Sequence, residues 1–139
     1  MNTPIAALTE QLRTRFTATA ELWGNNAYQD KAPDSANPTI GYMVFQYLAG
    51  GEINLIKTED AELIYGIRGV STKPEEAEQM AVRINALLND AENSAPFTDA
   101  DGWHIASVTG KQAIHLIQDE DSNRIYHEGK QYVFRMEAV

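Results

Sequence analysis

The stretch AELIYGIRGVSTKPEEAEQMAVRINALLNDA, residues 61–91, joins the clearest strand pattern in the chain to its clearest helix pattern. Between Ala61 and Val70, Leu63, Tyr65 and Ile67 share one face, as expected for a strand. From Pro74 onward, apolar residues recur with i, i+3, i+4, i+7 spacing, which is typical of an amphipathic helix with one buried stripe. The stripe consists of Ala77, Met80, Ala81, Ile84, Leu87, Leu88 and Ala91. The sequence therefore predicts a strand followed directly by a helix that ends near residue 92.

Both helices that the sequence predicts carry start signals. Thr72 and Glu75 fit a capping box, and Pro74 suits a first helical turn. At the start of the chain, Thr3 is a candidate N-cap and Pro4 again suits the first turn. An apolar stripe follows at helical spacing, formed by Ile5, Leu8, Leu12 and Phe16.

Upstream of residue 61, the pattern predicts one long strand and two flexible connections. Ile40–Leu48 carries apolar groups on both faces, which indicates a central strand that the Gly50-Gly51 pair ends. A short extended piece, residues 27–30, leads into a proline-containing loop at residues 30–39. Residues 52–60 read either as an extended arm or as a hairpin tip, and we expect both connecting segments to become ordered on assembly.

The last third of the chain is predicted to be sheet. Strands at 103–108 and 113–118 are separated by Gly110-Lys111, a plausible two-residue turn. The chain then returns from residue 124 to residue 137, where apolar and polar residues alternate. The order of elements predicts an α+β fold in a single domain, with a mostly antiparallel sheet packed against two helices.

Composition excludes several classes of function. The 139 residues include 20 acidic and 11 basic side chains, a formal net charge of −9. This balance argues against general duplex binding and against docking on an anionic membrane. The absence of cysteine excludes disulfides, thiol catalysis and cysteine-ligated metals. The N-terminus lacks the pattern of a signal peptide and no run is long enough to span a bilayer, so a cytoplasmic product is expected.

Three histidines offer one route to chemistry. If Gly110-Lys111 turns a hairpin and residues 119–123 form a five-residue loop, His115 lies opposite His127 and diagonal to His104. Three imidazoles on one sheet face suit a zinc ion with an open fourth position. The alternative interpretation is that all three are ordinary half-exposed sheet residues, because a one-residue slip in either register separates them.

The elements taken together resemble the tail terminator proteins, also called tail-completion or minor tail proteins, of long-tailed bacteriophages. The resemblance covers nearly the whole chain. It rests on LWGNNAY at 22–28, on IGYMVFQY at 40–47, on the strand-to-helix run from Ala61, and above all on RIYHEGKQYVFR at 124–135.

The resemblance implies an interaction protein and not an enzyme, with no cofactor and no membrane partner. Members of this family form a hexameric ring on the head-proximal end of the tail tube, end tube polymerisation and present a surface to the head–tail connector. DNA passes through such a ring without specific binding. The implied location is the virion, after synthesis in the host cytoplasm. The alternatives are another head–tail joining or tube-like virion protein, or a small metal-dependent enzyme that uses the histidines.

Two groups of residues are candidates for contacts within such a particle. Apolar residues of the 52–60 segment have no obvious core to join, so they and the neighbouring lysine are interface candidates: Ile53, Leu55, Ile56 and Lys57. The acidic tip formed by Asp119, Glu120 and Asp121 is a candidate for the wall of the central channel. An acidic wall repels phosphate, which would let DNA slide without sticking.

Overall fold

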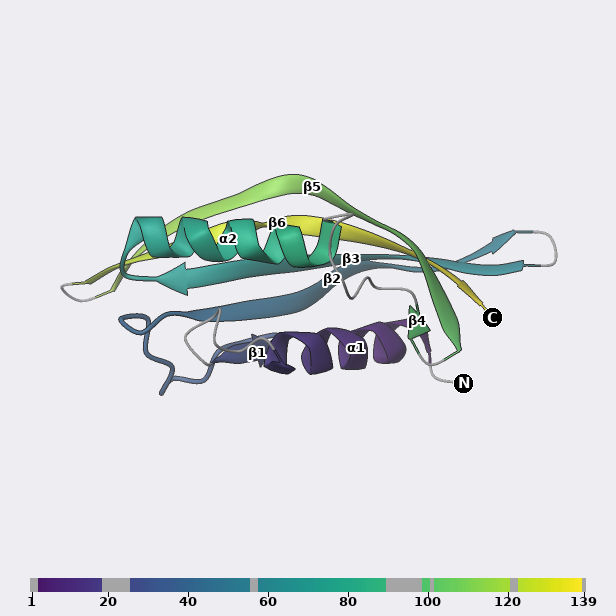
Figure 1. Ribbon diagram of the computed structural model, residues 1–139, viewed down its shortest axis with the longest axis horizontal. Coiled ribbons are helices and arrows are strands. Elements are labelled where there is room, and N and C mark those ends of the chain that lie inside the picture. Colours follow the sequence, from purple (N-terminus) through teal and green to yellow (C-terminus); the bar gives the residue numbers. More distant parts are fainter. Residues whose placement is uncertain are drawn as a thin grey trace.

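The computed structural model describes residues 3–18, 26–55, 58–89, 99–100, 102–120 and 123–138. The elements are α1 (Pro4–Ala18), β1 (Ala27–Gln29), β2 (Tyr42–Leu55), β3 (Thr58–Ser71), α2 (Pro74–Asn89), β4 (Asp99–Ala100), β5 (Trp103–Glu120) and β6 (Asn123–Ala138). The described strands form one sheet in the order β1-β2-β3-β6-β5-β4, in which only β1 and β2 are parallel. This architecture confirms the predicted α+β class (Figure 1).

The two faces of the sheet have different environments. The helix face packs against α1 and α2 and contains the main core, whose largest buried side chains include Trp103, Tyr65, Tyr132 and Phe134. We call the opposite side the outer face. It carries a second, small cluster of Val44, Val70 and Ile125, onto which Ala32 of the 30–39 loop packs. The predicted loop therefore covers one end of a sheet that has apolar groups on both faces.

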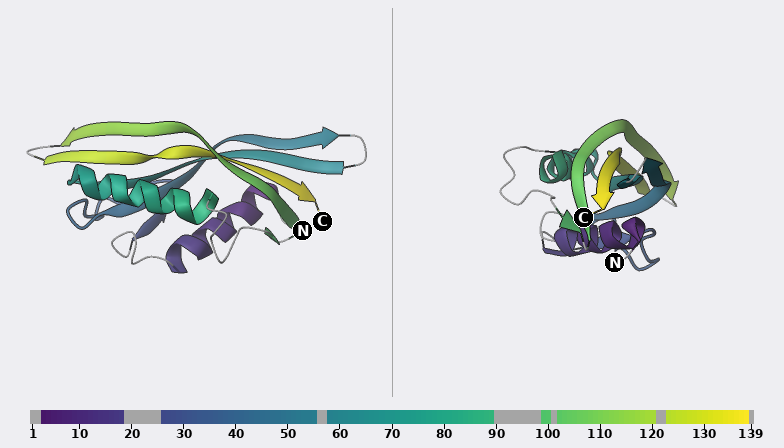
Figure 2. Two further views of the ribbon diagram at one scale, coloured as in Figure 1. Left: turned by 45° about the horizontal axis from the view of Figure 1, so that its top comes forward. Right: turned by 90° about the vertical axis from the view of Figure 1, so that its right-hand side faces the viewer.

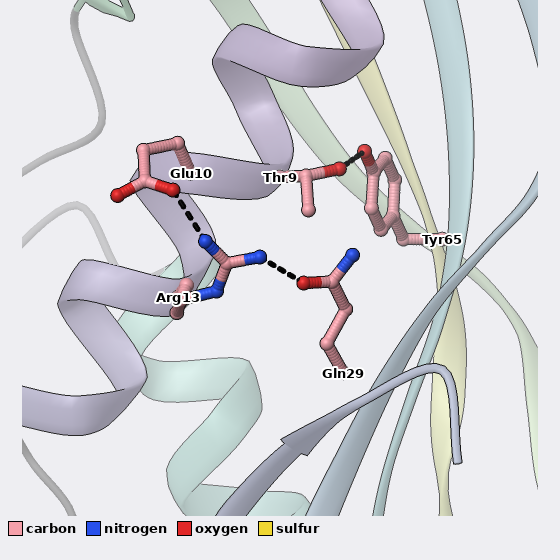
Figure 3. Close-up of polar contacts among 5 residues, drawn as sticks. All are labelled: Thr9, Glu10, Arg13, Gln29 and Tyr65. Atoms are coloured by element: carbon pink, nitrogen blue, oxygen red, sulfur yellow. Dashed lines mark hydrogen bonds and ion pairs between the residues drawn. The ribbon is translucent and has the colours of Figure 1, made fainter.

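Helix α1 follows the sequence prediction closely. The Thr3 hydroxyl accepts a hydrogen bond from the Ala6 N–H at 3.2 Å, which satisfies one of the unpaired donors at the helix start. The buried stripe is Pro4, Ala7, Leu8, Leu12 and Phe16. On its polar side, Thr9 bonds the Tyr65 hydroxyl at 2.6 Å, while Arg13 bonds both Glu10 and Gln29 (Figure 3). These contacts hold α1 to β1 and β3.

Helix α2 begins one residue later than the predicted capping box requires. The Lys73 carbonyl accepts the first helical hydrogen bond, from the Ala77 N–H at 3.1 Å, so Lys73 and not Thr72 is the N-cap. The Ser71 hydroxyl accepts from the Lys73 N–H at 3.1 Å and orders the chain just before the helix. Within the described residues the helix ends at Asn89, and its buried stripe is Ala77, Met80, Ile84 and Leu88.

The Gly50-Gly51 pair does not end a strand, as predicted, but lies inside β2. A register shift between Tyr47 and Ala49 marks a bulge, and Gly50 has a φ of +118°, a conformation that only glycine adopts readily. Beyond it, β2 continues to Leu55, which pairs with Thr58 of β3. Residues 52–60 are thus the end of a hairpin, and this hairpin extends past both helices (Figures 1 and 2).

The predicted hairpin at Gly110-Lys111 is also wrong. β5 is one continuous strand of 18 residues, and its register against β6 shifts between Gly110 and Ala113. Between these two positions β5 has two residues and β6 has one, so the extra residue of β5 forms a bulge. The partner strand β6 continues without a break from Asn123 to Ala138. Asp119 pairs with Arg124 at the other end, so the β5–β6 hairpin projects away from the β2–β3 hairpin (Figure 2).

Candidate interaction surfaces

The histidines do not form the predicted metal site. His115 pairs in register with Glu128, while Leu116 pairs with His127, so the two imidazoles lie on opposite faces of the sheet. His104 is opposite Glu137, near the other end of β5. Among the residues that the structure describes, no group of three potential ligands is close enough to hold a metal ion. The sequence argument failed for two reasons: β5 does not turn at Gly110-Lys111, and the β5–β6 register differs by one residue from the assumed one.

His127 is instead the centre of a polar chain across the outer face. Only 7% of the residue is exposed. Its Nδ1 accepts a hydrogen bond from Nε of Arg68 on β3 at 3.2 Å, and its Nε2 lies 3.1 Å from Oε1 of Gln118 on β5. Burial, and secondarily the Arg68 charge, lowers the pKa of His127 to about 4. The ring is therefore neutral at neutral pH, and Nε2–H donates to Gln118.

A groove of about 480 Å³ lies beside this polar chain. It runs between the 30–39 loop and the end of the β5–β6 hairpin, and it is lined by Ala32, Pro33, Asp34, Ala36, Pro38, Tyr42, Gln118, Asn123 and Ile125. Its volume falls in the usual range for ligand sites. Because Gln118 is both a lining residue and a partner of His127, the polar chain fixes one wall of the groove.

Two of the four interface candidates, Ile53 and Leu55, lie near the end of the β2–β3 hairpin. Ile53 pairs in register with Asp60, and Leu55 pairs with Thr58. Ile56 and Lys57 lie outside the described residues. The pairing decides the open choice at residues 52–60 in favour of a hairpin, whose end extends beyond the helices (Figure 2).

Two of the three acidic candidates, Asp119 and Glu120, lie at the opposite end of the molecule, at the end of β5. Asp119 accepts a hydrogen bond from Arg124 at 3.1 Å, and both side chains are mostly exposed. Glu120 pairs in register with Asn123, and Asp121 is outside the described residues. The Arg124 contact offsets part of the negative charge that the sequence assigned to this tip.

Exposed apolar residues on the outer face were missed by the sequence analysis. Leu48 on β2 is 43% exposed and Leu116 on β5 is 53% exposed. A Cβ added to Gly66 would meet Leu48 Cδ1 at 3.1 Å and Ile114 Cδ1 at 3.5 Å, so side chains from β2 and β5 both lean over this glycine. The result is an apolar stripe across the sheet, which we define as Leu48, Ile114 and Leu116. The sequence analysis had placed Leu48 in a central strand with apolar groups on both faces and had given Ile114 and Leu116 no role.

This arrangement has a counterpart among solved structures. A chain from the virion of a native gene transfer agent particle has the same fold. The two superpose with a TM-score of 0.69 and are 16% identical, and the match covers 98% of this chain and 96% of that one. No protein-family model and no curated protein matches the chain.

The match therefore spans nearly the whole of both chains. At 16% identity it establishes the fold alone. None of the described helices is long and apolar enough to cross a membrane.

Proposed function

We propose that the chain is a structural protein of a phage-like virion, and that it acts as a tail terminator. Six copies form a ring on the head-proximal end of the tail tube, stop its growth and offer a surface for attachment of the head. The observation that carries the proposal is the full-length match to a chain of a gene transfer agent virion. It agrees with the sequence resemblance to tail terminators, which arose from different observations.

The shape of the subunit supports this role. A closed ring needs two different surfaces that complement each other on every copy, and a cap needs further surfaces above and below. The β2–β3 and β5–β6 hairpins project from opposite ends of the sheet (Figure 2). They carry the apolar and the acidic candidate segments respectively. One subunit can therefore contact different neighbours at its two ends.

The net charge is consistent with a channel for DNA. Six copies carry a formal charge of −54, six times the −9 of one chain. We propose that this excess of negative charge repels phosphate and lets DNA pass through the ring without sticking.

The geometry gives no support to the metal-enzyme alternative, because the candidate ligands are separated. A tube-like or other joining protein of the virion remains as a second candidate, since the same structural match supports any component of such a particle. The two candidates differ in what their loss does to a tail. Loss of a terminator leaves the tube subunit able to polymerise, whereas loss of a tube subunit leaves no tube.

Electron microscopy of particles assembled without this chain tests the proposal. Tubes longer than normal and without heads are the expected result. Normal-length tails joined to heads would contradict the proposed function, and complete absence of tubes would favour the tube-subunit alternative.

A hairpin variant tests the proposal at the level of residues. Replacing residues 54–59 with Asn-Gly links the register partners Ile53 and Asp60 by a two-residue turn. It removes Leu55, Ile56 and Lys57 while leaving the helices and their core intact. We expect a folded chain, seen as an unchanged far-ultraviolet circular dichroism spectrum, that fails to end tube growth. Normal tail termination by this variant would exclude the hairpin end as a contact.

A further inference from the structure

The molecule has a groove at one end of its sheet and a projecting hairpin at the other end. Tyr42, the first residue of β2, lines the groove, whereas Leu55, the last residue of that strand, lies at the hairpin end. The 14 residues of β2 span roughly 40 Å, at about 3.3 Å per residue. The hairpin end of one chain therefore cannot reach the groove of the same chain (Figure 2).

The groove combines apolar walls with one charge. Its walls include Pro33 and Pro38 of the 30–39 loop, together with Tyr42 and Ile125. Proline loses no side-chain entropy when an occupant covers it. Asp34 is the one charged side chain among the described residues that line the groove. An occupant that matches these walls is mainly apolar and carries a cation.

The polar chain on the outer face prepares a further contact in the groove. Oε1 of Gln118 accepts a hydrogen bond from Nε2–H of His127 at 3.1 Å, and Arg68 bonds the other nitrogen of the ring. With its oxygen engaged, Gln118 has its amide N–H groups to donate to an acceptor in the groove. The backbone carbonyl groups of an extended segment are such acceptors.

The end of the β2–β3 hairpin has the matching composition. Residues 53–58 read INLIKT, in which Lys57 is the one charged residue. The apolar members are Ile53, Leu55 and Ile56. The segment is thus locally positive in a chain whose formal net charge is −9. Its lysine complements Asp34, and its apolar residues complement the proline and tyrosine walls of the groove.

We propose that the hairpin end of one copy, residues 53–58, docks in the groove of a second copy, with Lys57 beside Asp34. This inference rests on the proposed function, because it names the contact that joins neighbours in the ring. Each copy supplies one hairpin end and one groove, so the same contact repeats from copy to copy. A heterologous contact of this kind closes a ring when successive rotations complete a full turn.

Charge reversal tests the contact, because the two partners of the ion pair lie on different copies. Asp34→Lys brings two lysines together, and Lys57→Asp brings two aspartates together. Each single variant should therefore need about tenfold more protein to assemble, as measured by light scattering. In an equimolar mixture, the hairpin end of each variant complements the groove of the other, so assembly should return. The double variant Asp34→Lys, Lys57→Asp should also assemble.

Lys111→Asp is the matched control. It reverses the charge of an exposed lysine of β5 that belongs neither to the groove nor to the hairpin end. The variant should assemble as the natural chain does. The double variant Asp34→Lys, Lys111→Asp has the same net charge as the restored pair, but it should assemble no better than Asp34→Lys alone.

Cysteine cross-linking gives a second measurement, because the natural chain has no cysteine. The double variant Ala36→Cys, Leu55→Cys places one thiol in the groove and one on the hairpin end. After assembly, a short flexible bis-maleimide should give a ladder of covalent oligomers on a denaturing gel. Leu55→Cys combined with Val82→Cys, a site on α2 that is 69% exposed, should give single chains.

The outcomes separate this inference from the proposed function. If the natural chain assembles but the opposite charges fail to restore assembly, or if the assembled cysteine variant gives no ladder, hairpin docking is contradicted and the ring is not. Cross-linking to an added tail-tube subunit in place of a second copy also contradicts the docking. A natural chain that stays monomeric with and without tube subunits contradicts the ring, and hairpin docking with it.

Discussion

At two glycines of β3, Gly66 and Gly69, an added methyl group would point to opposite faces of the sheet. Substituting each by alanine therefore tests the packing on one face at a time. On the helix face, a Cβ added to Gly69 would lie 2.4 Å from Cβ of Met80 and 2.9 Å from its Sδ. Real Cβ contacts do not fall below 3.0 Å, and the Met80 Cβ is fixed to the helix backbone. Gly69→Ala therefore forces α2 away from the sheet. Overpacking of this kind costs about 1–3 kcal/mol, and we expect about 2 kcal/mol of lost unfolding free energy.

Gly66→Ala is the matched control on the same strand. Its Cβ would point to the outer face, 3.1 Å from Cδ1 of Leu48. That atom is the far end of a flexible and partly exposed side chain, so it can turn aside. Alanine also costs less conformational entropy than glycine in a strand, by about 0.5–1 kcal/mol. We expect a change within about 0.5 kcal/mol of the natural chain.

Urea unfolding followed by circular dichroism measures both variants. With an m-value of about 2 kcal/mol per molar urea, Gly69→Ala should lower the midpoint by about 1 M, and Gly66→Ala by less than about 0.3 M. Equal midpoints, or a larger loss for Gly66→Ala, would refute the assignment of rigid α2 to one face and of the flexible Leu48 side chain to the other.

Two further predictions concern buried polar groups. The pKa of His127 is about 4 in the folded chain and 6.5 in the unfolded chain, so between these values the unfolded chain binds one more proton. The contribution of His127 to the free energy of unfolding should therefore be complete above about pH 6.5. It should fall as the pH drops toward 4, with a slope of up to about 1.4 kcal/mol per pH unit. Urea titrations across this range should show that slope in the natural chain and in His115→Gln, but not in His127→Gln, and its survival in His127→Gln would contradict the assignment. Tyr65→Phe should cost about 1 kcal/mol, because it leaves the Thr9 hydroxyl without its partner (Figure 3). Arg13→Ala is the control, because it removes only exposed contacts, and it should lower the free energy of unfolding by less than about 0.5 kcal/mol in the same assay. If Arg13→Ala instead lost more than Tyr65→Phe, the Thr9–Tyr65 hydrogen bond would contribute little.

The parts of the fold that local periodicity determines were predictable. Both helices, the strand at residues 61–70 and the buried alternation of Tyr132, Phe134 and Met136 follow directly from spacing. Glycine was the main source of error. Gly50 and Gly110 carry the same local signal whether the chain turns or bulges, because glycine is common in both turns and bulges. Only the pairing of each glycine with the next strand decides between the two, Gly50 with Leu63 of β3 and Gly110 with Tyr132 of β6.

The surfaces were harder to predict than the fold. A one-residue difference in the β5–β6 register moved His115 and His127 to opposite faces, and no local pattern specifies that register. The exposure of Leu48 and Leu116 depends on which strands end the sheet, which is a property of the whole topology. Residues 52–60 could be read from the sequence either as an extended arm or as a hairpin tip, and only the pairing of β2 with β3 decides for the hairpin.

The mass and symmetry of the assembled protein test the central claim most directly. Light scattering and negative-stain electron microscopy of the purified chain, alone and with tail-tube subunits, measure both. The account predicts six-fold rings of about 92 kDa, since one chain has a mass of 15.4 kDa, either in isolation or at the ends of tubes. A chain that remains a monomer in both conditions, or that turns over a substrate, would contradict it.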